Sequence, residues 1–165
     1  MLKKMGQRLK NERGLTLIEL LAVVVILGII AAIAIPSIGG LINNSKRDAH
    51  IANAQQMVSA ARMAVTANEV NFDTSVTDGK SGKIKMSALI AKGYLEDFEN
   101  PSGDGYNTDT SLVTLTKDNS TGNITYTVTL VGPADAGTKV YLNTADPSKA
   151  TRDNVKLDGG ATVPE

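Results

Sequence analysis

One uninterrupted apolar segment near the start of the chain constrains the fold more than any other feature. Residues 20–35 form a run of 16 residues without a polar side chain, and the run extends back to Leu15 with only Thr16 and Glu19 as polar positions. An α-helix rises about 1.5 Å per residue, so the 21 residues 15–35 can cover a hydrocarbon core about 30 Å thick. We therefore predict a helix that spans a membrane.

Charge is distributed unevenly around this segment. The first 14 residues hold five Lys or Arg and one Glu, a net charge of +4, whereas the rest of the chain holds 12 basic and 16 acidic residues, a net charge of −4. Because basic flanks tend to stay in the cytoplasm, everything after Pro36 is expected outside the membrane. Since the acidic body lacks clustered basic residues, duplex binding as the main role is disfavoured.

Glu19 decides between an ordinary secretory signal and a more specialised segment. A signal peptide also begins with basic residues, but its apolar core is usually about 7 to 15 residues long. A carboxylate in hydrocarbon is costly unless it has a partner, and no basic residue of the span can supply one. A free amine created by cutting the chain before Leu15 could supply it, on the same molecule or on a neighbouring copy.

Residues 13–19, Arg-Gly-Leu-Thr-Leu-Ile-Glu, together with the apolar run resemble the prepilin signature of type IV pilins, competence pilins and secretion pseudopilins. The resemblance covers about residues 1–70 well and the remainder only in outline. It implies that a membrane aspartyl peptidase cuts between Gly14 and Leu15 and that the new Leu15 amine is N-methylated. Leu15 departs from the commoner phenylalanine. The resemblance also implies that Glu19 pairs with the amine of an adjacent subunit, which would relieve the cost of an unpaired buried charge.

The same resemblance implies a structural subunit that polymerises into a helical filament. The implied partners are further copies, the prepilin peptidase, an assembly platform in the membrane and minor pilins. The precursor would be a single-pass membrane protein with a cytoplasmic N-terminus, and the assembled filament would lie at the cell surface. Gly28 and Pro36 lie where related filaments loosen this helix on assembly; Gly weakens a helix by about 1 kcal/mol and Pro removes a backbone hydrogen bond. A simple kink at Pro36 is the open alternative.

The predicted fold class is α+β, with four segments along the chain: a leader (1–14), a transmembrane and assembly helix (15–36), an amphipathic continuation (37–68) and a small outer domain (69–165). In the third segment apolar residues recur at spacings of three and four, which predicts one apolar stripe. The residues of this stripe are Ile38, Leu41, Ile42, Ala54, Met57, Val58, Ala61, Ala64 and Val65. A small antiparallel sheet is expected to pack on the stripe, as in type IV pilins.

The outer domain is predicted from turn residues and alternating patterns. We expect an exposed polar loop to about Gly82, a short helix over residues 84–95, and an irregular tail with at most a short strand at 155–157. Three segments read as strands, the first two joined by a hairpin loop at 118–123: 112–116, 124–131 and 139–142. No cysteine is present to cross-link any of these parts.

Catalytic chemistry has no support in the sequence. There is no Gly-x-Ser-x-Gly motif, no phosphate loop and no cysteine, so we expect no enzymatic activity and no cofactor. His50 is the only histidine and is expected to be an ordinary surface residue. Asp104, Asn107 and Asp109 are weak calcium candidates, because their spacing does not fit an EF-hand and a plain polar turn explains them.

Two other functions stay open. A competence pseudopilin would aid DNA uptake, for which Lys80, Lys83 and Lys85 offer a small basic cluster, although a solvated loop edge explains these residues equally simply. A pseudopilin of a type II secretion-like system would be favoured by calcium binding. DNA binding by the chain itself is therefore left undecided.

Overall fold

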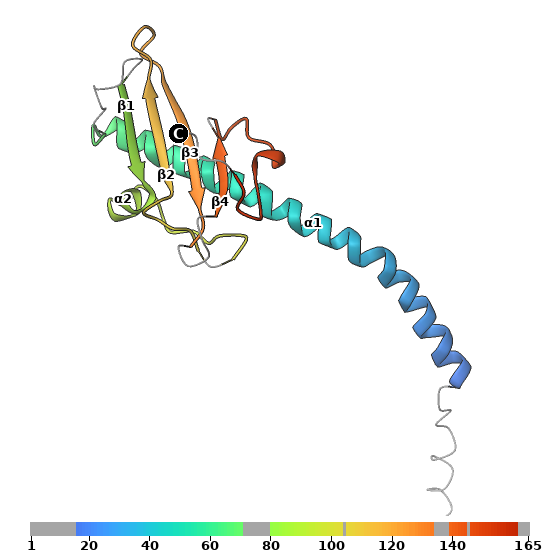
Figure 1. The fold of residues 1–165 in the computed structure, drawn as a ribbon. Coiled ribbons are helices and arrows are strands. Elements are labelled where there is room, and N and C mark those ends of the chain that lie inside the picture. Colours follow the sequence, from blue (N-terminus) through green and yellow to red (C-terminus); the bar gives the residue numbers. More distant parts are fainter. Residues whose placement is uncertain (1–15, 71–79, 104, 134–138, 145, 162–165) are drawn as a thin grey trace, which may run out of the picture. The chain divides into compact units, whose positions relative to one another are not determined.

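The computed structural model describes residues 16–70, 80–103, 105–133, 139–144 and 146–161 (Figure 1). It has the predicted α+β fold, a long N-terminal apolar helix and a four-stranded antiparallel sheet. By its internal contacts the chain divides into two compact units, Met1–Leu41 and Ile42–Glu165, and each is described by itself. In chain order the elements are α1 (Leu17–Thr66), β1 (Lys80–Lys85), α2 (Met86–Ala91), β2 (Leu112–Lys117), β3 (Ile124–Val131), β4 (Val140–Thr144) and the short 3-10 helix η2 (Arg152–Asn154).

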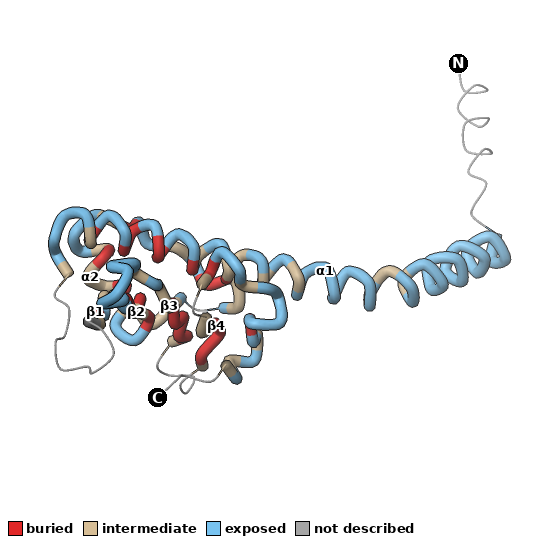
Figure 2. The backbone as a smooth tube through the Cα atoms, turned by 90° about the horizontal axis from the view of Figure 1, so that it is seen from above, coloured by how far each residue is buried: buried red, intermediate tan, exposed pale blue. Residues whose placement is uncertain are grey.

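The described part of the first unit is helix, apart from Thr16 at its start. None of its described residues is buried, and nearly all are exposed (Figure 2). The helix is long and apolar enough to cross a membrane. It continues through Gly28 and Pro36 without interruption in the single chain. Loosening at these two positions concerns the assembled filament and stays a prediction.

In the second unit, α1 buries one face against the sheet. The buried apolar residues of this face are Ala54, Met57, Val58, Ala60, Ala61 and Ala64. Their spacing confirms the predicted stripe from residue 54 onward. The prediction was wrong for its first three positions, because Ile38, Leu41 and Ile42 are exposed. Four of the six are alanines, which lets the helix backbone lie close to the strands it covers.

The helix ends at Thr66 because Asn68 takes a left-handed conformation, with φ of 60°. The Asn68 N–H donates to the Val65 carbonyl, and the Glu69 N–H donates to the Ala64 carbonyl. These two bonds form a Schellman motif, in which asparagine replaces the more usual glycine. The predicted end near residue 68 is therefore right to within two residues.

The sheet has the strand order β1-β2-β3-β4, and all neighbouring pairs are antiparallel. The three predicted strands are confirmed as β2, β3 and β4, and the hairpin loop closes with a hydrogen bond from the Asp118 N–H to the Asn123 carbonyl. The core lies between α1 and the sheet, where Leu115, Val128, Leu130 and Leu142 are fully buried.

Strand β1 was missed, because its residues were predicted to be loop and helix. Its inward positions are Gly82, which is buried opposite Leu115, and the half-buried Ile84, while Lys83 and Lys85 point outward. An alternating strand whose inner face includes a glycine shows almost no hydrophobic pattern in sequence. The predicted helix 84–95 is correspondingly shorter: α2 ends at Ala91, and Gly93 with φ of 74° turns the chain away.

The C-terminal segment is tied back onto the second unit by non-covalent contacts. Val155 and Gly160 form isolated bridges with Leu142 and Val140 on the outer edge of β4. Arg152 forms a bidentate ion pair with Asp48 on α1, with both N···O distances 2.7 Å. The predicted irregular tail is confirmed for residues 146–161, and these contacts hold that segment without a cross-link.

Candidate functional site

The N-terminal end of α1 is organised around Glu19. Its carboxylate accepts hydrogen bonds from the Thr16 backbone N–H at 2.8 Å and from the Thr16 hydroxyl at 2.6 Å. The Glu19 N–H in turn donates to the Thr16 hydroxyl oxygen at 3.3 Å. This reciprocal pattern is a capping box, and Thr-x-x-Glu before an apolar run is its sequence signature. Sequence reasoning gave Glu19 a charge-pairing role and overlooked this one.

The capping box places a carboxylate in the first turn of a helix, where the positive end of the helix dipole favours negative charge. It also holds that carboxylate against Thr16, the residue that directly follows Leu15. Gly14 and Leu15 themselves lie outside the described residues. Beyond Glu19, the described helix presents only apolar side chains and small residues as far as Ile35.

Comparison with protein families gives one match, the prokaryotic N-terminal methylation motif, over residues 9–35. The chain carries the type IV pilin and pseudopilin signature. The matched residues include the last part of the basic leader, Glu19 and the apolar half of α1. Searches of curated proteins and of solved structures give no significant match.

The signature has three direct consequences. It supports a type IV pilin or pseudopilin, without separating pilus, competence and secretion systems. It implies processing by prepilin peptidase and assembly into a filament. Together with the apolar helix it fits a precursor anchored in a membrane.

The prediction for His50 was wrong, because the side chain is fully buried, with 0% of its surface exposed. Its Nε2 lies 2.8 Å from the Ser102 Oγ, and its Nδ1 lies 2.6 Å from the Tyr106 hydroxyl oxygen. The ring stacks on Tyr141 with 4.9 Å between the centroids. A signal was present in the sequence, since His50 lies four residues before Ala54 and therefore on the apolar stripe of α1.

The hydrogen bonds around Tyr106 favour one tautomer of His50. The Asn53 side-chain amide donates to the Tyr106 hydroxyl oxygen at 3.2 Å, which favours donation of the hydroxyl proton to His50 Nδ1. Nε2 then carries the ring proton and donates to Ser102. A histidine that activates a serine needs a free lone pair toward it, and in the favoured tautomer Nε2 does not present one to Ser102.

Burial, together with a smaller contribution from the positive charge of Lys46, lowers the pKa of His50 to about 4. Burial also raises the pKa of Tyr106. Both groups are thus neutral at pH 7, and together they join α1 to the loop before β2 and to β4. His50 is a structural centre of the second unit.

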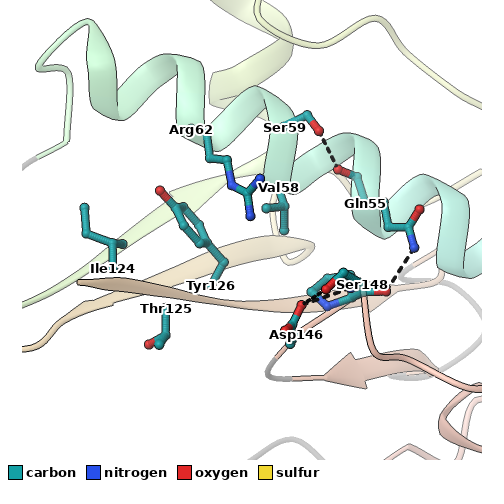
Figure 3. Close-up of a pocket in the computed structure, with 10 residues that line it drawn as sticks. Gln55, Val58, Ser59, Arg62, Ile124, Thr125, Tyr126, Asp146 and Ser148 are labelled. Carbon is teal, nitrogen blue, oxygen red and sulfur yellow. Dashed lines mark hydrogen bonds between the residues drawn. The ribbon is translucent and has the colours of Figure 1, made fainter.

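A groove lies between α1 and the start of β3, and we call it the α1–β3 groove (Figure 3). It has a volume of about 340 Å³, and Gln55, Val58, Ser59 and Arg62 form its helix side. The Arg62 guanidinium lies 5.2 Å from the centre of the Tyr126 ring, a cation–π geometry. Among the described residues, Arg62 makes no ion pair.

The weak calcium candidates are only partly described. The Asn107 side-chain oxygen accepts hydrogen bonds from the backbone N–H groups of Asp109 and Thr110, and Asp109 accepts one from the Ser87 hydroxyl. Asp104 lies outside the described residues. Within the described part of the chain, no group of three or more His, Cys, Asp or Glu could hold a metal ion.

Proposed function

We propose that this chain is a prepilin, the structural subunit of a type IV pilus or pilus-like filament. The observation that carries the proposal is the first half of α1, an exposed apolar helix of membrane-spanning length with one acidic residue, Glu19, in its first turn. Such a surface needs either lipid or other copies of the same helix to cover it. A filament core supplies the second cover once the subunit leaves the membrane.

Processing follows from the same end of the helix. Prepilin peptidase cuts between Gly14 and Leu15, and the Leu15 amine is methylated. In sequence the new amine then lies one residue before Thr16, whose N–H and hydroxyl hold the Glu19 carboxylate. Methylation keeps this amine basic and therefore positively charged.

Assembly pairs Glu19 with the Leu15 amine of a neighbouring copy. Only copies with the correct axial stagger neutralise both charges, so the pair sets the register of the filament. Gly28 and Pro36 are the positions at which α1 loosens as copies pack. Partners are further copies, the peptidase, the assembly platform and minor pilins, and the filament lies at the cell surface.

The test uses Glu19→Gln, which keeps an oxygen acceptor for Thr16 but removes the charge. We expect Glu19→Gln to insert into the membrane normally and to deplete filaments in a sheared-cell preparation, as Glu19→Ala also would. Glu12→Gln, in the leader, is the matched control and should leave filament yield unchanged. Wild-type filament yield from Glu19→Gln would refute the charge pairing. A mature N-terminus other than methylated Leu15, found by mass spectrometry, would refute the processing step.

One observation favours a competence pseudopilin as the second candidate. Lys83 and Lys85 are exposed side by side on the outward face of β1, where they could meet a phosphate backbone. Replacing Lys80, Lys83 and Lys85 with Gln should then reduce DNA retention by cells. Unchanged DNA retention would refute DNA contact through these lysines and leave the filament function as the only candidate.

A further inference from the structure

The second unit carries unpaired charges of opposite sign at two separate places on its surface. One is Arg62 in the α1–β3 groove, which forms no ion pair with another described residue. Asp146 also lines this groove, but its carboxylate is already paired with the Lys149 ammonium at 3.5 Å. The other is the loop of residues 96–99, which we call the acidic loop. Its Glu96, Asp97 and Glu99 are exposed and form no ion pair with another described residue, while Phe98 packs against the core.

The acidic loop is firmly placed. The Phe98 ring lies edge-on to Tyr106, with 5.7 Å between the centroids. The Glu99 carbonyl accepts a hydrogen bond from the Asn53 side chain on α1 at 3.2 Å. The loop therefore presents its carboxylates from a fixed base, which lowers the entropy cost of a contact.

The two surfaces cannot meet within one copy. Asn53, which holds the acidic loop, and Arg62, which lines the groove, are nine residues apart on α1. At 100° and 1.5 Å per residue, this separation places them on opposite flanks of the helix and about 13 Å apart along its axis. The groove and the acidic loop also lie at opposite ends of β3. The groove lies at residues 124–126, where β3 begins, whereas the chain that follows the acidic loop is held at the end of β3 by a hydrogen bond from the Asn107 N–H to the Val131 carbonyl.

We propose that the α1–β3 groove receives the acidic loop of a second copy of this chain. Complementary surfaces at different places on one molecule form a head-to-tail contact, which does not close on itself and can extend into a filament. Arg62 would meet a carboxylate of the loop while its stack on Tyr126 holds the guanidinium in place. This inference rests on the proposed filament function and adds a specific contact between outer units.

The absence of cysteine from the chain makes the contact testable by cross-linking. A full-length variant with Ser59→Cys and Asp97→Cys carries one thiol at the groove and one at the loop. Mild oxidation of its sheared filaments should give a ladder of disulfide-linked oligomers, because every copy offers both ends of the contact. Each single variant should stay largely monomeric on the same gel. The matched control pair is Ser59→Cys with Ser120→Cys, which moves the second thiol to the exposed β2–β3 hairpin.

A second arm tests the charge. Arg62→Glu should lower filament yield, and adding Asp97→Arg to it should restore the yield. Normal filaments without the ladder, or with an equal ladder from the control pair, would refute the groove contact and leave the filament function standing. Absence of filaments from the wild-type chain would refute the filament function and this contact together.

Discussion

Acidification should destabilise the second unit through protonation of His50, which is the only histidine of the chain. The folded protein keeps this imidazole neutral and buried, with a pKa of about 4. An unfolded chain exposes it, and its pKa returns to about 6.5. Between these two values the unfolded state binds a proton that the folded state does not.

The size and sign of the effect follow from this difference. The contribution of His50 to the free energy of unfolding is fully present above about pH 6.5 and is lost as the pH falls to about 4. A shift of about 2.5 units at about 1.4 kcal/mol per unit corresponds to about 3 kcal/mol. That is a large share of the stability of a typical domain, about 5 to 15 kcal/mol.

The assay is urea unfolding of the full chain in detergent micelles at a series of pH values from 4 to 7. Intrinsic tyrosine fluorescence suits it, because the chain has no tryptophan and its four tyrosines, residues 94, 106, 126 and 141, all belong to the second unit. His50→Gln is the comparison, since an amide cannot take up the proton. The difference in pH dependence between the two proteins isolates His50 from the carboxylates, which both share.

Two results would refute this reasoning. Parallel stability profiles for wild type and His50→Gln between pH 4 and 6.5 would mean that His50 does not titrate differently on folding. An imidazole pKa near 6.5, measured by NMR on the single histidine, would mean that the ring is not held neutral. The same spectra report the tautomer, for which we expect the proton on Nε2.

Two further changes test how the second unit is held together. Gly159→Ala should lower the free energy of unfolding by more than about 1 kcal/mol, because φ is +82° there and an added Cβ would lie 2.4 Å from the Lys139 Cβ. Gly39→Ala is the control, because an added Cβ at residue 39 meets no atom within 4 Å. It should not lower stability in the same urea titration. Ser111→Ala should lower the free energy of unfolding by about 2 kcal/mol, because the buried Ser111 hydroxyl donates to the Val131 carbonyl and accepts from the Val131 N–H. Ser120→Ala, at an exposed position, should change it by less than about 0.5 kcal/mol. Equal effects of the two changes would mean that the Ser111 hydrogen bonds do not stabilise the fold.

Local signals were sufficient for the elements whose pattern is complete in a short stretch of chain. The apolar segment predicted the first half of α1, because sixteen successive apolar residues have few alternatives to a helix. Alternating residues on both sides of a turn predicted the β2–β3 hairpin, because neighbouring strands pair through short loops. The methylation motif is also local, and it was recognised from residues 13–19 with the apolar run.

The tertiary structure alone decided what depends on residues far apart in the chain. Strand β1 exists because β2 offers it a partner, and its own residues, with glycine facing inward, carry almost no strand pattern. His50 is buried because Ser102, Tyr106 and Tyr141 gather around it from more than fifty residues away and satisfy both ring nitrogens. The sequence predicted a polar helix surface there, because a buried polar group can be recognised only from the hydrogen-bond partners that offset its loss of solvation.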